Sequence, residues 1–289
     1  MNPALQAVLL GVVEGVTEFL PISSTGHLIV AERLIGYRDA GETFTIVVQL
    51  GAILAIVWFY WRELIGRLTG LFRGQADARR FWLNLVIASI PAGVVGLLFQ
   101  NAIKARLYSP TVVALSLIVG GVILYLVEVR RERAGDPVAE GAPDGADGRG
   151  AGGGHDGLDR ITTRQALLIG VAQTVALIPG VSRSGASIVG GLLLGLPRVT
   201  ATAFSFFLGL PILGLAGLYS LYKARHVLGQ VPGGSPALLL GTGVAFVTAL
   251  LSVGWLLRYV SRHDFKGFAV YRVVFGALIL VLVFAGLLR

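Results

Sequence analysis

Two short segments of this chain concentrate the side chains that could do chemistry. Residues 14–27 read EGVTEFLPISSTGH and residues 179–188 read PGVSRSGASI. Both segments are polar and contain helix-breaking residues, yet each is embedded in long apolar sequence. An ionised side chain in hydrocarbon costs about 2.5–3.5 kcal/mol even on the gentler insertion scales, so such residues indicate a functional site.

The first segment carries two carboxylates, Glu14 and Glu18, which are four residues apart. This spacing places both on one face of a helix. Two convergent carboxylates suit a divalent cation such as Mg²⁺, which prefers oxygen ligands and shares them with substrate phosphates. Helix packing is the alternative role, because Gly11 and Gly15 form a pair of small residues at which two helices can approach closely.

A run of hydroxyl side chains and one imidazole follows the helix-breaking Pro21: Ser23, Ser24, Thr25, Gly26 and His27. The run supplies a candidate nucleophile and a candidate base. Hydroxyls near a helix start can instead satisfy loose backbone groups, and a membrane histidine can be a packed, hydrogen-bonded residue. The two neighbouring carboxylates favour the catalytic interpretation.

The second segment carries one guanidinium, Arg183, between Ser182 and Ser184, with Gly180 and Gly185 nearby. A guanidinium with hydroxyls and backbone N–H groups at a helix N-terminus forms a cradle for an anion. Phosphate fits it better than carboxylate, because a metal site on the first segment also favours phosphate. The alternative is an Arg–Glu ion pair that joins the two halves of the molecule.

The composition indicates an integral α-helical membrane protein. The chain is 55% hydrophobic and 14% charged, whereas an average soluble domain has about 25% charged residues. Six apolar runs have about the 20 residues that span a bilayer, and they are 43–60, 82–99, 111–127, 200–222, 236–257 and 268–288. They fill most of the chain, so a separate soluble domain is excluded.

The two polar segments each interrupt a stretch too short for two spans, which need about 40 residues. We predict a re-entrant helix–loop–helix hairpin over 3–35 and another over 163–196, each followed by three spans. A repeat with an odd number of crossings must be inverted across the membrane, and its site lies near the midplane. The predicted fold is therefore all-α, with six transmembrane helices and two re-entrant hairpins in an inverted 3+3 repeat, 1–133 and 161–289.

The region 134–160 is rich in glycine and acidic residues, and it predicts a disordered cytoplasmic linker between the repeats. The positive-inside rule places the loops 62–81, 129–164, 196–199 and 258–267 in the cytoplasm and both termini outside. The formal charge of +8 does not indicate a nucleic-acid partner, because these loops hold most of the 24 Lys and Arg residues. The absence of cysteine excludes disulfide and thiol chemistry.

The two polar segments resemble the signature motifs of the bacterial undecaprenyl-diphosphate phosphatase family, which is linked to bacitracin resistance. The resemblance covers essentially the whole chain apart from 134–160. It implies removal of the terminal phosphate from undecaprenyl diphosphate, a polyprenyl diphosphate lipid, which returns undecaprenyl phosphate to peptidoglycan synthesis. It also implies a location in the lipid bilayer of the cytoplasmic membrane, with an active site that opens to the outer face.

The resemblance further implies roles for individual residues. Glu14 and Glu18 would be an acidic pair in an enzyme that depends on Mg²⁺ or Ca²⁺. Ser24 would be the nucleophile, His27 its catalytic partner and Arg183 the phosphate binder. The supporting substrate-binding residues would be Ser23, Thr25, Gly26, Ser182, Ser184 and Gly185.

A different class of function uses the same residue types. Inverted repeats with broken helices are a transporter architecture, so a lipid-phosphate flippase or an ion-coupled anion transporter is the alternative. A carrier has little need of a nucleophile, so Ser24→Ala should leave transport largely intact. The glycine-rich helical surface is compatible with a homodimer.

Overall fold

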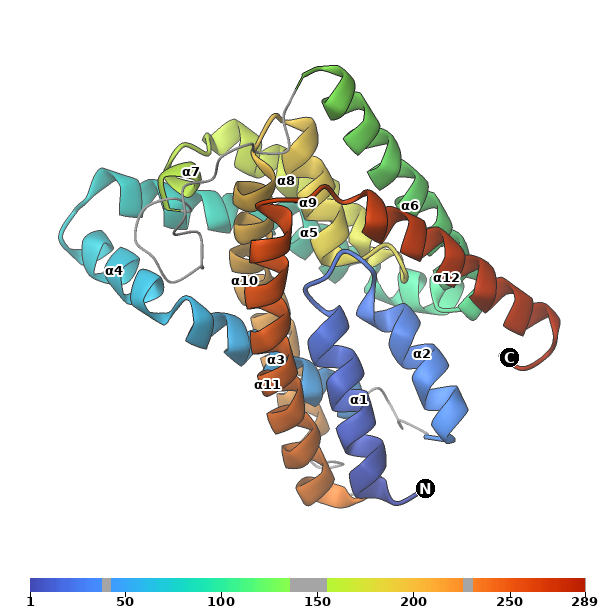
Figure 1. The fold of residues 1–289 in the computed structure, drawn as a ribbon. Helices are drawn as coiled ribbons and strands as arrows, with labels where there is room; N and C mark the ends of the chain where they lie inside the picture. The colour runs from blue at the N-terminus through green and yellow to red at the C-terminus, as the bar shows by residue number, and fades with distance from the viewer. Residues whose placement is uncertain (38–42, 136–154, 226–230, 289) are drawn as a thin grey trace.

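The computed structural model describes residues 1–37, 43–135, 155–225 and 231–288, and these form helices joined by short turns (Figure 1). The first half contains α1 (Pro3–Thr17), α2 (Ser24–Ile35), α3 (Thr43–Phe59), α4 (Trp61–Phe72), α5 (Ala76–Leu107) and α6 (Pro110–Arg133). The second half contains α7 (His155–Asp159), α8 (Thr163–Thr174), the 3₁₀ turn η2 (Val175–Leu177), α9 (Arg183–Leu193), α10 (Arg198–Ala224), α11 (Gly234–Val260) and α12 (Lys266–Phe284).

The helices confirm an all-helical, multi-pass membrane protein. In the described residues, α5, α6, α10, α11 and α12 contain stretches long and apolar enough to cross a bilayer. The helices α3 and α4 together make a sixth candidate, but they are bent by 71° at Tyr60. The six predicted apolar runs therefore correspond to α3, α5, α6, α10, α11 and α12.

The segment after α3 differs from the sequence prediction, which treated 62–81 as a loop. The structure forms α4 and the beginning of α5 there. Leu64, Ile65 and Leu68 recur at helical spacing among charged residues, which produces an amphipathic helix. Such a helix suits a membrane surface better than a membrane interior.

Both polar segments are helix breaks, as the sequence predicts. The chain leaves α1 at Thr17 and starts α2 at Ser24, and it leaves α8 through η2 before starting α9 at Arg183. The breaks contain Pro21 and Pro179, which cannot continue the backbone hydrogen-bond ladder of a helix. The two hairpins approach each other from opposite ends of the molecule, and their turns meet near its middle (Figure 1).

Glycines set how closely the hairpins pack on the long helices. A Cβ at Gly11 or Gly15 of α1 would clash with backbone carbonyls of α11, and a Cβ at Gly170 of α8 would clash with the backbone of Ala88 in α5. Gly11 and Gly15 therefore allow the close helix contact that their spacing predicts. The two hairpins are held in corresponding ways by α11 and α5.

The four regions that the charge pattern assigns to one side of the membrane, of which 62–81 is mostly helical, are joined by contacts at one end of the molecule. Arg67 pairs with Asp159 at 2.6 Å, and Arg198 pairs with the buried Glu128 at 2.5 Å. The backbone N–H of Phe265 donates to the same Glu128 carboxylate. Segments far apart in the sequence therefore share this end.

The structure corrects the predicted end of the linker. The sequence predicts disorder through residue 160, and 136–154 lie outside the described residues. The residues 157–160 are instead packed, because Leu158 is buried in the hydrophobic core and Asp159 binds Arg67. These contacts hold the short segment, which includes the end of α7, against the rest of the fold.

The ion pair between Arg198 and Glu128 allows a prediction about stability. We expect Arg198→Ala to lower the free energy of unfolding by about 3–5 kcal/mol, because the fully buried Glu128 would lose its counter-charge. Unfolding of the detergent-solubilised protein with increasing SDS measures this. The matched control is Arg80→Ala, which removes an exposed pair with Asp77 and should cost less than about 1 kcal/mol. Equal losses for the two variants would contradict the prediction.

Candidate functional site

The residues before α2 and α9 share an unusual backbone conformation. Ser23 has φ 70° and Ser182 has φ 76°, and they are the only non-glycine residues with positive φ in the described part of the chain. Serine adopts this region only when its surroundings hold it there, and such strain clusters at functional sites. The result is two helix N-termini, at Ser24 and Arg183, whose free backbone N–H groups can bind an anion.

The two loops contact each other directly. The Ser184 hydroxyl donates to the carbonyl of Leu20 at 3.0 Å, which joins the second motif to the first. The Ser182 hydroxyl accepts from the backbone N–H of Gly185 at 3.1 Å and lies 3.0 Å from the Ser184 hydroxyl. These contacts bring the starts of α2 and α9 into one site.

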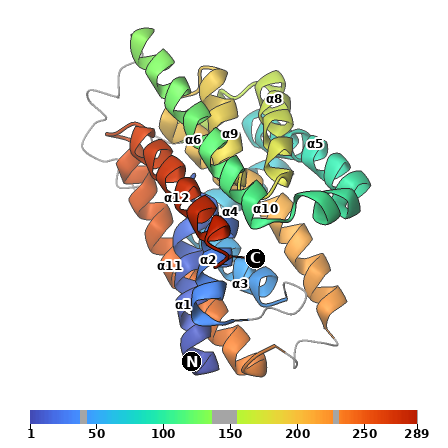
Figure 2. The ribbon, with the colours of Figure 1, turned by 90° about the vertical axis from the view of Figure 1, so that its right-hand side faces the viewer.

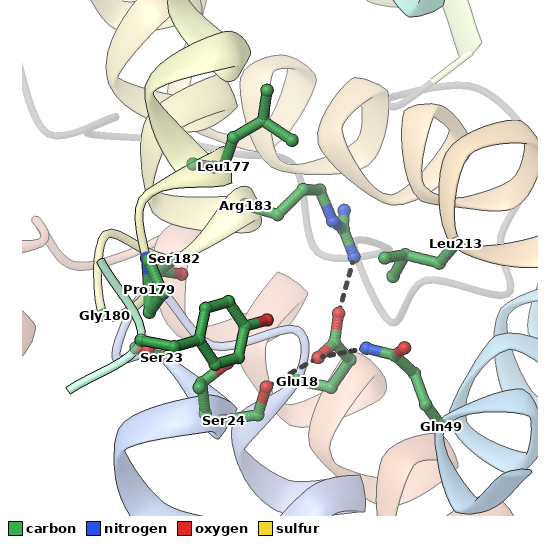
Figure 3. A pocket seen from close by; sticks show the side chains of 13 residues that line it. Glu18, Ser23, Ser24, Gln49, Leu177, Pro179, Gly180, Ser182, Arg183 and Leu213 are labelled. Atoms are coloured by element: carbon green, nitrogen blue, oxygen red, sulfur yellow. Dashed lines mark hydrogen bonds and ion pairs between the residues drawn. The ribbon is translucent and has the colours of Figure 1, made fainter. Parts of the chain in front are cut away.

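The carboxylate of Glu18 is the centre of this site (Figure 3). One of its oxygens accepts from the Ser24 hydroxyl at 2.7 Å and from the Gln49 amide at 3.3 Å. The other accepts from Nη2 of Arg183 at 3.2 Å. A serine of α2, an amide of α3 and a guanidinium of α9 therefore converge on one buried carboxylate that follows α1.

Arg183 is held in a single orientation. Its Nη1 donates to the carbonyl of Ser205 at 2.7 Å, and its guanidinium lies 5.6 Å from the ring centre of Phe19. A Cβ at Gly209 would lie 2.9 Å from both terminal nitrogens, so glycine is needed for this approach. The buried Nε has no acceptor among the described residues, and an anionic ligand would satisfy it.

These groups line a cavity of about 140 Å³ between the two motif loops (Figure 3). Its walls come from both motifs and from the neighbouring helices: Glu18, Ser23, Ser24, Thr25, Gln49, Tyr108, Ala176, Leu177, Pro179, Gly180, Ser182, Arg183 and Leu213. Hydroxyls, a carboxylate and a guanidinium dominate its polar lining. This combination suits a phosphate ester or anhydride better than an apolar ligand.

His27 does not lie among the residues that line this cavity, although the sequence predicts a catalytic role for it. Its Nδ1 lies 2.8 Å from the carbonyl of Ser23, and its Nε2 lies 2.7 Å from the hydroxyl of Tyr271. Since a carbonyl can only accept, Nδ1 donates and Nε2 accepts from Tyr271. Its ring also stacks on Phe275, with centroids 4.2 Å apart. In this structure the Ser24 hydroxyl therefore contacts Glu18, and His27 contacts α12.

Glu14 lies one helical turn before Glu18 and is almost completely buried, and like His27 it is not among the residues that line the cavity. Neither of its carboxylate oxygens has a hydrogen-bond partner among the described residues. Unpartnered buried oxygens need an explanation, and they fit ligands of a cation. The described residues contain no group of three or more His, Cys, Asp or Glu that could hold a metal, so phosphate oxygens and water would complete the coordination of a cation here.

The two motif glycines serve packing in this structure. A Cβ at Gly26 would lie 3.1 Å from Leu117, and a Cβ at Gly185 would lie 2.8 Å from Nη1 of Arg272. The site also includes residues that the two motifs do not contain, above all Gln49 and Arg272. The sequence feature that points to Gln49 and Arg272 is their polarity within apolar helices, because such side chains in a membrane segment indicate a functional role.

Comparisons with known proteins agree with the two motifs. The family model described as Bacitracin resistance protein BacA matches residues 7–278, which include both segments. The chain is 48% identical over 287 residues to Undecaprenyl-diphosphatase 1 of Paraburkholderia xenovorans, covering 99% of this chain and 97% of the relative. It is 48% identical over 290 residues to Undecaprenyl-diphosphatase of Deinococcus radiodurans, with the same coverage.

Proposed function

This chain belongs to the bacitracin resistance protein BacA family, and on that premise we propose that it is an undecaprenyl-diphosphatase. It removes the terminal phosphate of undecaprenyl diphosphate and leaves undecaprenyl phosphate, the carrier lipid of peptidoglycan synthesis. The observation that carries the proposal is the chain of contacts from the Ser24 hydroxyl through Glu18 to Arg183. It supplies a nucleophile, a proton acceptor and an anion-binding group in one cavity.

The mechanism begins with in-line attack of the Ser24 oxygen on the terminal phosphorus. Glu18 accepts the hydroxyl proton, since its oxygen already receives that hydrogen bond at 2.7 Å. The bond from the phosphorus to the bridging oxygen breaks, and undecaprenyl phosphate leaves. Water then attacks the phosphorus, the bond to the Ser24 oxygen breaks, and the proton held by Glu18 returns to Ser24 as phosphate leaves. Arg183 and the N-termini of α2 and α9 stabilise the negative charge that develops on the transferred phosphoryl group.

This assignment changes the role expected of His27. The family resemblance implies that His27 is the catalytic partner of Ser24, whereas the contact at the Ser24 hydroxyl is made by Glu18. In the proposed mechanism His27 orients the start of α2 through the Ser23 carbonyl. Thr25 and Ser182, which line the cavity, contact the phosphate groups, and Ser184 supports them through Leu20.

The proposed cofactor is a divalent cation, Mg²⁺ or Ca²⁺, held by Glu14 and Glu18. The unpartnered carboxylate oxygens of the buried Glu14 support this assignment. Bound there, the cation would neutralise charge on the diphosphate oxygens.

The proposed architecture is an inverted repeat of 1–133 and 161–289, in which each re-entrant hairpin precedes three spans. Three observations support it: α1 packs on α11 as α8 packs on α5, α3 packs on α10, and α6 packs on α12 (Figure 2). We place the protein in the bacterial cytoplasmic membrane with both termini and the site opening outside. The lipid tail stays among the apolar helices while the diphosphate enters the cavity.

Phosphate release from undecaprenyl diphosphate by the purified, detergent-solubilised protein tests the proposal. We expect release with Mg²⁺ or Ca²⁺ and only background release with EDTA, because the cation offsets substrate charge. Phosphate release that persists in EDTA would contradict the proposed cation requirement but not the proposed phosphatase activity. A folded wild-type protein that releases no phosphate with either cation would reject the enzyme, and transport of lipid phosphate in vesicles would then be measured.

A further inference from the structure

Arg272 of α12 lies where the two motif loops meet, and it is 1% exposed. Its Nη1 donates to the carbonyl of Pro21 in the first loop at 3.0 Å. Its Nη2 donates to the carbonyls of Val181 and Gly180 in the second loop, at 2.8 and 3.3 Å. One guanidinium therefore joins the backbones of both loops.

The remaining acceptors of Arg272 are also backbone carbonyls. Its Nε donates to Leu117 and its Nη2 to Ser116, both in α6 and both at 3.4 Å. No carboxylate among the described residues contacts this guanidinium, which remains charged at neutral pH. A buried charge is normally paired. Here the partners are backbone carbonyls, and one of them belongs to Gly180, which lines the cavity.

The packing of α6 against α12 shows which residue corresponds to Arg272 in the first half of the chain. A Cβ at Gly121 of α6 would lie 2.7 Å from the carbonyl of Ala269 in α12. A Cβ at Gly276 of α12 would lie 2.7 Å from the carbonyl of Ala114 in α6. The two contacts are reciprocal and have the same residue spacing, so the two helices pack as counterparts.

In this register Leu117 is the counterpart of Arg272. Leu117 is fully buried and meets Gly26 of α2, just as Arg272 meets Gly185 of α9. An apolar side chain therefore fills the equivalent space in the other half. Packing alone does not require a guanidinium at this position, so the five carbonyl contacts and the charge must serve another purpose.

We propose that Arg272 is a positioning residue for phosphate release, which holds the two motif loops so that Ser24 and Arg183 face the same phosphate. The inference rests on the proposed function. Pro21 lies three residues before Ser24, and Val181 lies two before Arg183, so fixing these carbonyls fixes the starts of α2 and α9. Catalysis depends steeply on this placement, since a shift of about 1 Å can cost about a hundredfold in rate.

The first test is Arg272→Leu, which copies the residue at the corresponding position, Leu117. We expect a folded protein, judged by its thermal unfolding midpoint in detergent, whose kcat for undecaprenyl diphosphate falls about a hundredfold. KM should stay near the wild-type value, because the contact organises the reacting groups and not the lipid tail. A purely structural role would instead lower activity only in proportion to the loss of folded protein.

A second variant keeps the charge and moves it. Gly120→Ala places a methyl group against the Arg272 guanidinium, 2.9 Å from Cζ and closer still to Nη2. The end of the flexible arginine can yield without disturbing the helices, so we expect a folded protein with kcat lowered in the same direction. The matched control is Gly93→Ala on α5, which meets nothing within 4 Å and should keep wild-type kcat.

The outcomes separate the two proposals. A folded wild-type protein that releases no phosphate would reject the proposed function itself. An active wild type with folded Arg272→Leu at wild-type kcat would overturn the role of Arg272. If Arg272→Leu does not fold, Gly120→Ala decides: a kcat equal to that of Gly93→Ala overturns the proposal, and a selective loss supports it.

Discussion

Glu18→Gln and Ser24→Ala should each lower kcat for phosphate release by about a thousandfold, the range in which a positioned proton acceptor acts. Glutamine keeps the shape of Glu18 but cannot accept the proton that Ser24 now donates across 2.7 Å. It also removes the negative charge that orients Arg183. Phosphate release at saturating undecaprenyl diphosphate, normalised to folded protein, measures both effects.

The double variant of Glu18 and Ser24 sharpens this prediction. Residues that act as one unit are not additive, so the double substitution should be no slower than the worse single one. His27→Ala is the control, because its described contacts are with Ser23 and α12 and none is with the Ser24 hydroxyl. We expect His27→Ala to lower kcat less than Glu18→Gln does. A larger loss in His27→Ala, or phosphate trapped on His27, would transfer the proton acceptor or nucleophile to the imidazole.

Arg183→Ala should lower kcat by about a hundredfold to a thousandfold, as removal of one charge-stabilising donor does in other active sites. The loss should appear mainly in kcat, since the guanidinium faces the charge that develops on the transferred phosphoryl group. Arg183→Lys should recover only part of the rate. Lysine is a point charge and cannot hold Ser205 and Glu18 with separate nitrogens in one plane, as Arg183 does.

The control for this prediction is Arg80→Ala. Arg80 is exposed and is not among the residues that line the cavity, so this variant should keep wild-type kcat. Steady-state kinetics on all three variants give kcat and KM separately. An Arg183→Ala variant with wild-type kcat and a raised KM would show that the guanidinium only binds the substrate and does not stabilise its reaction.

The sequence by itself determined the elements and the chemical content of the site. Apolar length and helix breakers are local properties, so five of the six apolar runs coincide with helices long enough to span a bilayer and the sixth coincides with α3. The breaks at Pro21 and Pro179 lie between the predicted helices. The hydroxyls, carboxylates and guanidinium of the two motifs are visible because each is costly in an apolar segment. The cavity does contain Glu18, Ser24 and Arg183.

Only the tertiary structure decided which groups meet. Arg183 reaches Glu18 across 165 positions of the chain, and His27 reaches Tyr271 across 244. The sequence offers an Arg–Glu pair between the two halves as one alternative, and the structure contains such a pair. Which carboxylate meets Arg183, and that His27 meets Tyr271, depends on how α9 and α12 pack on the first hairpin. The same holds for Arg272, which binds backbone carbonyls on both loops. Carbonyls are present in every residue, so the sequence alone could not identify its partners.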